Sequence, residues 1–299
     1  MTITRRQLVL LVAVTLMWGC NWPLMMISLR EVPPLGFRAL TMTGGVLLMA
    51  GWFSVRGLSL RVPRADWRGV IALALPNIVG WHLASIIGLT LLPAGRAAIL
   101  AFTMPVWTVI LGVLLFAQVL TRRMLVACVC ALAAVGLLAA DELTSLAGRP
   151  VGVLWLPAAA ASWALGTLLL KRIPVTLSTE ALTLWMMAVG SVVFWVAALL
   201  FEPALAPLSW SATTWASLVW GTAINFGVSQ LLWFTLAREL PAQASSFSLM
   251  AVPFLGVVSS ALLVGEVPRA ADWLAVLFIG AAIAAATGAF ARRGDNRGS

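Results

Sequence analysis

Leu92-Pro93-Ala94 begins one long apolar run, and Leu240-Pro241-Ala242 begins another 148 residues later. The same offset relates further pairs, namely Asn77 and Asn225, His82 and Gln230, Pro105 and Pro253, and Gln118 and Glu266. Nearer the start of each half the offset is 145, and it relates Trp18 to Trp163 and Gly45 to Gly190. Repetition at a fixed period indicates a duplicated architecture. We therefore predict two related halves, residues 1–145 and 146–299.

Each half contains five apolar runs of the length that a membrane-spanning helix needs, about 20 residues. The ten runs are 8–29, 36–55, 67–89, 95–118, 123–140, 150–170, 180–201, 212–235, 243–265 and 272–291. They are continuous rather than alternating, which excludes a membrane β-barrel. Because five is odd, the second half must be inverted relative to the first. The sequence thus predicts an all-α integral membrane protein of ten transmembrane helices in two inverted five-helix repeats.

The composition agrees with a chain that lies almost entirely in a lipid bilayer. Of its 299 residues, 62% are hydrophobic and 10% are charged, with a mean hydropathy of +1.03. A soluble domain has about 45–50% apolar and about 25% charged residues. The net charge of +9 comes from basic residues in short loops, which set the orientation of membrane proteins. We therefore expect no nucleic-acid partner.

The distribution of Lys and Arg predicts the orientation. Fourteen of the nineteen lie on one side of the predicted topology, and the other five are Arg30, Arg38, Arg96, Arg149 and Arg269. The richer side is predicted to be cytoplasmic, which puts both termini in the cytoplasm. Gln118 and Glu266 fall at span ends, where we expect boundary or capping residues.

No Asp, Glu, Lys or Arg is expected deep in any span. This argues against a proton antiporter driven by a buried carboxylate, and against a substrate with a strong uncompensated net charge. The only titratable group expected well inside is His82. Three roles stay open for it: a hydrogen bond to a neighbouring helix, contact with substrate, and proton coupling. Its counterpart Gln230 favours a hydrogen-bonding role, because an amide does not carry protons.

Several polar and aromatic residues fall near the middle of spans, where they need a partner or a cavity. They are Trp18, Asn77, Trp81, Trp163 and Asn225. Asn77 and Trp81 share a helix face, whereas His82 lies about 140° away from Asn77 on an ideal helix. For these residues two interpretations stay open, packing between helices and the lining of a substrate cavity.

No catalytic or metal-binding set can be assembled from this chain. Cys20, Cys128 and Cys130 lie inside apolar runs without metal-ligand spacing, and His82 is the only histidine. An intramembrane enzyme would need a nucleophile with a base, or paired carboxylates. We therefore expect no enzymatic activity, no metal and no cofactor.

The repeat contains the motifs Trp18-Gly19-x-Asn21, a mid-span Pro105, Ala251-Val252-Pro253 and Gly265-Glu266-x-Pro268. Their order, spacing and duplication resemble the ten-span, EamA-type branch of the drug/metabolite transporter superfamily. Within that branch the chain looks most like the YddG-type exporters of aromatic and other neutral amino acids.

The resemblance implies a central cavity lined by both halves and export from the cytoplasm by alternating access. Carried onto this chain, the cavity residues are Trp18, Asn77, His82, Met104, Trp163 and Gln230. It also implies a bacterial inner-membrane protein with a small-molecule substrate, and we expect a monomer. The smaller four-span relatives carry a glutamate in their first helix for proton exchange. This chain has no acid there, which favours facilitated flux.

Other functions stay open on the sequence. The chain could export other amphipathic drugs or metabolites. A lipid or sugar-lipid translocator would need a basic path for the phosphate inside the membrane, and the sequence contains no such cluster. A channel is disfavoured, because a channel does not require the inverted repeat that this sequence predicts.

Proline residues within the spans predict the hinges. Pro76, Pro105 and Pro253 interrupt backbone hydrogen bonding and can let a helix bend. Replacing each with Ala is expected to lower flux and to change the accessibility of cysteines introduced into the cavity. Unchanged flux together with unchanged accessibility would contradict the hinge assignment.

Overall fold

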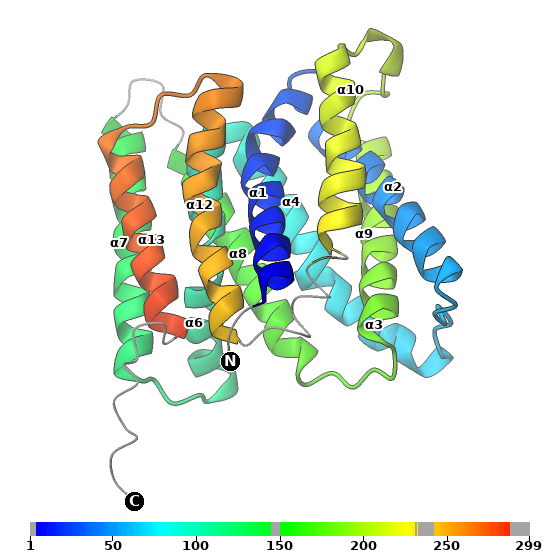
Figure 1. Ribbon diagram of the computed structural model, residues 1–299, viewed down its shortest axis with the longest axis horizontal. Helices are drawn as coiled ribbons and strands as arrows, with labels where there is room; N and C mark the ends of the chain where they lie inside the picture. The colour runs from blue at the N-terminus through cyan, green and yellow to red at the C-terminus, as the bar shows by residue number, and fades with distance from the viewer. Residues whose placement is uncertain (1–3, 145–149, 231, 233–241, 288–299) are drawn as a thin grey trace, which may run out of the picture.

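A computed structural model describes the backbone of residues 4–144, 150–230, 232 and 242–287, and the regular structure in these ranges is helical. The helices stand side by side in a bundle, and α1 begins at the same lower end at which α13 ends (Figure 1). The α-helices are α1 (Arg5–Ser28), α2 (Pro34–Val55), α3 (Trp67–Ala74), α4 (Trp81–Leu91), α5 (Ala94–Ala101), α6 (Met104–Phe116), α7 (Arg122–Thr144), α8 (Pro150–Leu170), α9 (Thr179–Phe201), α10 (Ala212–Val219), α12 (Ala242–Val264) and α13 (Ala270–Thr287). Two π-helices, η2 (Leu75–Gly80) and η4 (Trp220–Val228), and two short 3₁₀ turns, η1 (Arg64–Asp66) and η3 (Pro207–Ser209), complete the described structure.

The predicted apolar runs coincide with these helices to within about four residues at their described ends. Six helical segments are long and apolar enough to cross a membrane among the residues described, namely Arg5–Ser28, Arg64–Leu91, Ala94–Phe116, Arg122–Thr144, Val151–Leu170 and Thr179–Phe201. The count of ten spans stays a prediction. Several predicted features lie outside the described residues. They are the boundary between residues 145 and 146, Arg149, the run 233–235, the start Leu240-Pro241 and the run 288–291.

The apolar core has two main parts. The larger surrounds α5, in which every residue from Ala94 to Ala101 is buried, and it includes side chains of α1, α7, α12 and α13. The smaller joins α2, α3 and α9 and includes Phe226 of η4. Within the larger part α1 packs against α12 and α7 against α13, and within the smaller part α2 packs against α9. First-half and second-half helices are therefore interleaved rather than separate.

The two halves repeat a backbone irregularity. The π-helices η2 and η4 contain Asn77 and Asn225, which the 148-residue offset relates. In η2, Pro76 has no N–H to donate, so the regular α-helical ladder cannot continue through it. The Pro76 carbonyl accepts a hydrogen bond of 2.9 Å from the Ser162 hydroxyl of α8. Single turns of π-helix are rare and often mark functional sites.

The repeat also governs how closely helices approach. A Cβ on Gly45 would lie 2.4 Å from Cβ of Phe226, and a Cβ on Gly190 would lie 2.4 Å from Cγ2 of Ile78. Gly45 corresponds to Gly190, and Ile78 corresponds to Phe226. These are therefore equivalent contacts, one between α2 and η4 and the other between α9 and η2. Small residues allow such close packing of helices in a membrane.

Carboxylates tie the halves together at the upper end of the bundle, where α1 and α12 end (Figure 1). Glu202 accepts hydrogen bonds of 2.8 Å from the backbone N–H groups of Leu35 and Gly36, at the start of α2. Glu266 accepts from Ala94 and Gly95 at the start of α5, at 2.6 and 3.0 Å. Each carboxylate satisfies N–H groups that a helix start leaves free. The capping role predicted for Glu266 is confirmed.

A third such link has a counterpart in the repeat. Glu31, in the loop after α1, accepts a 2.7 Å hydrogen bond from the Ser211 backbone, and this bond lowers the pKa of its carboxyl group. At the 145-residue offset, Ser211 corresponds to Asp66 and Glu31 to Thr176. Asp66 accepts from the Thr176 backbone at 3.0 Å and from its hydroxyl at 2.6 Å. The two hydrogen bonds thus join equivalent pairs of positions, and each connects the first half to the second. The first half supplies the carboxylate in both, from Glu31 in one pair and from Asp66 in the other.

The ends of α6 and α12 have the same geometry at the 148-residue offset. Ala117 and Gly265 both have positive φ, 51° and 72°, in the left-handed region. The next residue in each case, Gln118 or Glu266, donates its N–H six residues back, to Gly112 or Ser260. Glycine is the usual residue in the left-handed conformation at the end of a helix.

Ala117 and Gly265 therefore form a matched pair for testing backbone strain. An L-residue with a side chain in the left-handed region costs about 1–2 kcal/mol. Gly265→Ala is expected to lower the free energy of unfolding by about 1 kcal/mol, and Ala117→Gly to leave it unchanged or raise it slightly. The measurement is the denaturation midpoint of purified protein, followed by tryptophan fluorescence. Shifts of the same sign would contradict this account.

Candidate functional site

Four aromatic rings form a row along the boundary between the two halves. Trp163 of α8 contacts Trp81 of α4 edge to face, with ring centroids 5.4 Å apart. Trp81 lies 6.5 Å from His82, and His82 lies 5.3 Å from Phe226 of η4. These separations fall in the range favoured by aromatic pairs. The two inner rings, Trp81 and His82, belong to the first half, and the two outer rings, Trp163 and Phe226, belong to the second.

Trp18 makes the equivalent contact elsewhere on this boundary. Its indole N–H donates to the Ser229 hydroxyl at 3.2 Å, and Ser229 donates in turn to the Asn225 carbonyl. The repeat relates Trp18 to Trp163 and Ser229 to Trp81. The pair Trp18–Ser229 is therefore the counterpart of the pair Trp163–Trp81, with a hydroxyl in place of an indole. The boundary between the halves thus has a more aromatic and a more polar side.

The remaining residues predicted for the site lie in different surroundings. Asn77 is 4% exposed, donates to the Leu73 carbonyl at 2.9 Å, and has its amide directly against Gly166 of α8. Asn225 is buried, Gln230 is partly exposed, and Met104 packs at the edge of the larger core. As the helix geometry predicts, Asn77 and Trp81 both face α8 whereas His82 faces η4. Roles in substrate binding stay predictions for all of them.

The proposed hinge prolines occupy three different backbone settings. Pro76 lies in η2, whereas Pro105 is the second residue of α6, just after a turn at Phe102 and Thr103 that separates α5 from α6. Pro253 is buried inside the continuous helix α12. Two prolines related by the repeat therefore have different surroundings, because only the first follows a break. Their role as hinges stays a prediction.

Arg38 is a buried arginine near the start of α2. The sequence places Arg38 on the outer side of the membrane. In the structure it lies in the second turn of α2, with only 3% of its surface exposed. Its Nη2 donates to the Ser85 hydroxyl at 3.4 Å, and its Nε has no partner. Among the described residues, no carboxylate pairs with it. A buried cation without a counter-ion costs several kcal/mol, so its presence calls for an explanation.

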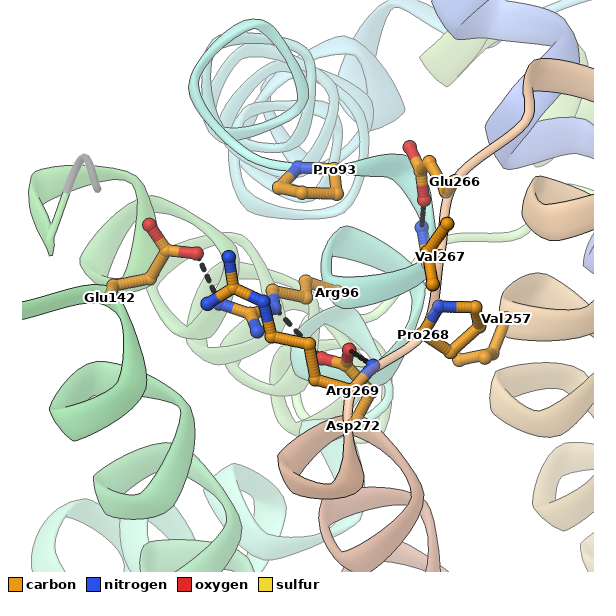
Figure 2. Close-up of a pocket in the computed structure, with 10 residues that line it drawn as sticks. Pro93, Arg96, Glu142, Val257, Glu266, Val267, Pro268, Arg269 and Asp272 are labelled. Carbon is orange, nitrogen blue, oxygen red and sulfur yellow. Dashed lines mark hydrogen bonds and ion pairs between the residues drawn. The ribbon is translucent and has the colours of Figure 1, made fainter. Parts of the chain in front are cut away.

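Arg96 is the second buried arginine, and it is fully compensated. It lies in α5 and is 5% exposed. It pairs with Asp272 of α13 at 2.8 Å and with both Asp141 and Glu142 of α7. Figure 2 shows its guanidinium between Glu142 on one side and Asp272 on the other. The sequence places Arg96 at the outer end of the predicted span 95–118, and the structure shows that this end of α5 is buried.

A small cavity lies beside this ion-pair cluster at the upper end of the bundle. It measures about 150 Å³, and its lining includes Arg96, Glu142, Glu266, Arg269 and Asp272 (Figure 2). Each of these charged groups is hydrogen-bonded or ion-paired within the protein. Because its charges already satisfy one another, we interpret the cluster as a link between the halves. Within the described ranges no group of His, Cys, Asp or Glu is arranged to hold a metal ion.

Comparison with known families identifies the architecture. The model of the EamA-like transporter family matches residues 5–140 and again residues 150–288. The chain belongs to the EamA-like transporter family. It is thus a multi-pass membrane transporter with the two-repeat fold of that family, and not an enzyme.

Several relatives of this EamA-like transporter are similar over most of their length. An uncharacterized transporter of Bacillus subtilis, YvbV, is 28% identical over 268 residues, covering 87% of this chain and 85% of that protein. A probable amino-acid metabolite efflux pump of Escherichia coli is 26% identical over 287 residues, covering 88% of each. An uncharacterized inner membrane transporter of Escherichia coli, YedA, is 24% identical over 268 residues, covering 89% and 85%. A crystal structure with 22% sequence identity superposes with a TM-score of 0.66 over 95% of this chain and 97% of that one, which supports the fold.

Three residues of this boundary were not predicted from the sequence, namely Arg38, Phe226 and Ser229. Ser229 carried a signal, since it lies one turn from Asn225 and matches Trp81 in the repeat. Phe226 carried a weaker one, because it follows Asn225 as Ile78 follows Asn77. Arg38 carried none, because a basic residue two positions into an apolar run is typical of the headgroup region.

The ion-pair cluster predicts a large difference between two neighbouring arginines. Arg96→Gln leaves three carboxylates without their shared cation, and breaking a buried ion pair costs about 3–5 kcal/mol. Arg269 also pairs with Asp141, at 3.0 Å, but its side chain is 54% exposed. Arg269→Gln is therefore expected to cost less than about 1 kcal/mol. Denaturation midpoints of the two variants, measured side by side, test this, and equal losses would contradict the structural role of Arg96.

Proposed function

We propose that this transporter exports neutral amino acids, aromatic ones in particular, and related amphipathic metabolites from the cytoplasm. Export would proceed by alternating access between two inverted five-helix halves, without coupling to protons. The proposal includes ten spans with both termini in the cytoplasm of a bacterial cell.

The observation that carries the proposal is the row of aromatic contacts across the boundary between the halves. Trp163 meets Trp81, and Phe226 meets His82, each from the opposite half. A movement of one half against the other must therefore separate or slide these rings. A ligand with an aromatic or apolar side chain can take the place of one ring against another, because stacked and edge-to-face pairs tolerate exchange of partners.

Polar groups beside this row suit the other end of an amino acid. Trp18, Ser229 and Asn225 form a hydrogen-bonded chain at the same boundary. In inverted-repeat transporters the substrate site lies at the repeat interface near the midplane, where irregular helices expose backbone groups. The π-helices η2 and η4 are irregular segments of this kind.

The absence of an acid in the first helix supports facilitated flux. Helix α1, Arg5–Ser28, contains no Asp or Glu. Proton-coupled transporters usually carry protons on intramembrane carboxylates. The name of the Escherichia coli relative, a probable amino-acid metabolite efflux pump, supports the substrate class and the direction of transport.

The experiment is efflux from proteoliposomes loaded with labelled Trp, Phe, Thr, Met or Lys, with and without a pH gradient. We expect saturable efflux of the neutral amino acids that does not respond to the gradient. The Trp163→Ala, His82→Ala double variant should lower efflux at least about tenfold, since it removes two of the four rings. Trp52→Ala is the matched control, because this exposed tryptophan lies at the far end of α2.

Three outcomes would contradict parts of the proposal. Flux that follows the pH gradient would overturn facilitated transport and direct attention to His82. Flux of amphipathic amines in place of amino acids would replace the substrate class. Scrambling of labelled lipid without amino-acid flux would replace the function with lipid translocation.

A further inference from the structure

Arg38 is a buried cation at the boundary between the halves whose charge the described residues do not neutralise. It is 3% exposed, and no carboxylate pairs with it among the residues described. Its Nε is buried and without a hydrogen-bond partner. Arg96, the other buried arginine, differs in this respect, because its side chain forms ion pairs with three carboxylates.

The surroundings of Arg38 connect it to the aromatic row. Its Nη2 lies 3.4 Å from the Ser85 hydroxyl, which donates to the His82 carbonyl one turn earlier on α4. His82 is 8% exposed, and its Nδ1 is also buried without a partner. Two residues that are linked through Ser85 thus each have a buried nitrogen without a partner. Buried polar groups almost always have partners, so a pair of exceptions needs a specific cause.

The position of Arg38 on α2 directs it towards this boundary. Arg38 and Gly45 are seven residues apart, which places them on nearly the same face of an α-helix. That face meets η4, since Gly45 packs directly against Phe226. The same Phe226 contacts the His82 ring at 5.3 Å. Arg38 therefore lies on the side of α2 that meets both the aromatic row and the second half of the protein.

We propose that Arg38, together with Ser85 and His82, forms a carboxylate-binding subsite, so that the transporter selects substrates with a free carboxylate. The guanidinium offers its unpartnered Nε–H beside an Nη–H, an arrangement that pairs with both oxygens of a carboxylate. The Nδ1 of His82 is the second unsatisfied group that an oxygen could engage. The aromatic rings beyond His82 would then contact an aryl side chain.

This inference rests on the proposed function and makes its substrate class more specific. The sequence argues against a substrate with a strong uncompensated net charge, and here Arg38 supplies the compensating cation for a carboxylate. Intramembrane ionisable residues usually mark a substrate or ion pathway, and the partner inferred here is the substrate itself. Amphipathic amines are correspondingly disfavoured, since a buried cation repels them.

The test uses four ligands that differ only at the two polar ends of one skeleton. L-phenylalanine and 3-phenylpropionate carry the carboxylate, whereas phenethylamine and L-phenylalaninamide lack it. Binding to the purified full-length protein is measured by isothermal titration. We expect the two carboxylates to bind the native protein at least about tenfold more tightly than the other two ligands.

Variants of Arg38 make the test specific to this side chain. Arg38→Gln should weaken binding of both carboxylates at least about tenfold and leave phenethylamine unchanged, while Arg38→Lys should weaken them less. Arg30→Gln is the matched control, because Arg30 is an exposed arginine at the same end of the bundle. The thermal midpoint of ligand-free Arg38→Gln should equal or exceed that of the native protein, since the substitution removes an uncompensated buried charge. A lower midpoint with an unchanged ligand preference would overturn the proposal in favour of a structural role.

The native protein alone keeps the proposal falsifiable if Arg38→Gln does not fold. Equal binding of phenylalanine and phenethylamine to the native protein would overturn the carboxylate subsite, even if amino acids are exported. Binding of 3-phenylpropionate that depends on Arg38, without export of any amino acid, would support the subsite and overturn the proposed function. Absence of binding by all four ligands would overturn the subsite.

Discussion

Inside a bilayer, a polar group must find its hydrogen-bond partner within the protein, and this constraint governs the structure described above. Within the π-helix η2, the Pro76 carbonyl accepts a hydrogen bond from Ser162 of the neighbouring helix α8. The free N–H groups at the starts of α2 and α5 are satisfied by Glu202 and Glu266 from the opposite half. The same constraint makes Arg38 and His82 informative, because their unpartnered nitrogens are exceptions.

The constraint also explains why the halves are interleaved. In each of the three contacts just described, the partner comes from the other half. Close approach through Gly45 and Gly190 brings Phe226 and Ile78 into equivalent positions. The fold therefore follows from contacts between the halves at least as much as from packing within either one. Aromatic and polar side chains gather at this boundary because it is the place where partners from both halves are available.

The sequence predicted the helical architecture well, because its signals are local or periodic. Run length located the helices, and the offsets of 145 and 148 residues related Trp18 to Trp163 and Asn77 to Asn225. Features that depend on tertiary packing were not predictable. Pro105 and Pro253 occupy equivalent positions in the sequence, yet only Pro105 follows a break. Arg38 resembles a headgroup arginine in the sequence, and only the packing of α2 against η4 and α4 reveals that it is buried. The partners of Arg96 lie 45, 46 and 176 residues away, so their pairing left no sequence pattern.

The ion-pair cluster around Arg96 has no counterpart in the other half. At the 148-residue offset, Arg96 corresponds to Ala244, Asp272 to Met124, Asp141 to Ala289 and Glu142 to Phe290. Perfect inverted symmetry would give the inward-facing and outward-facing states equal free energies. Because the equivalent positions in the other half carry no charges, the two states differ in free energy. One state is then more populated at rest, and a substrate encounters a competent site more often from one side of the membrane than from the other. In a carrier without an energy source, such a bias cannot drive net accumulation. It can only make the half-saturating concentrations on the two faces unequal, with the maximal rates unequal in the same proportion, so that flux still vanishes when the two concentrations are the same.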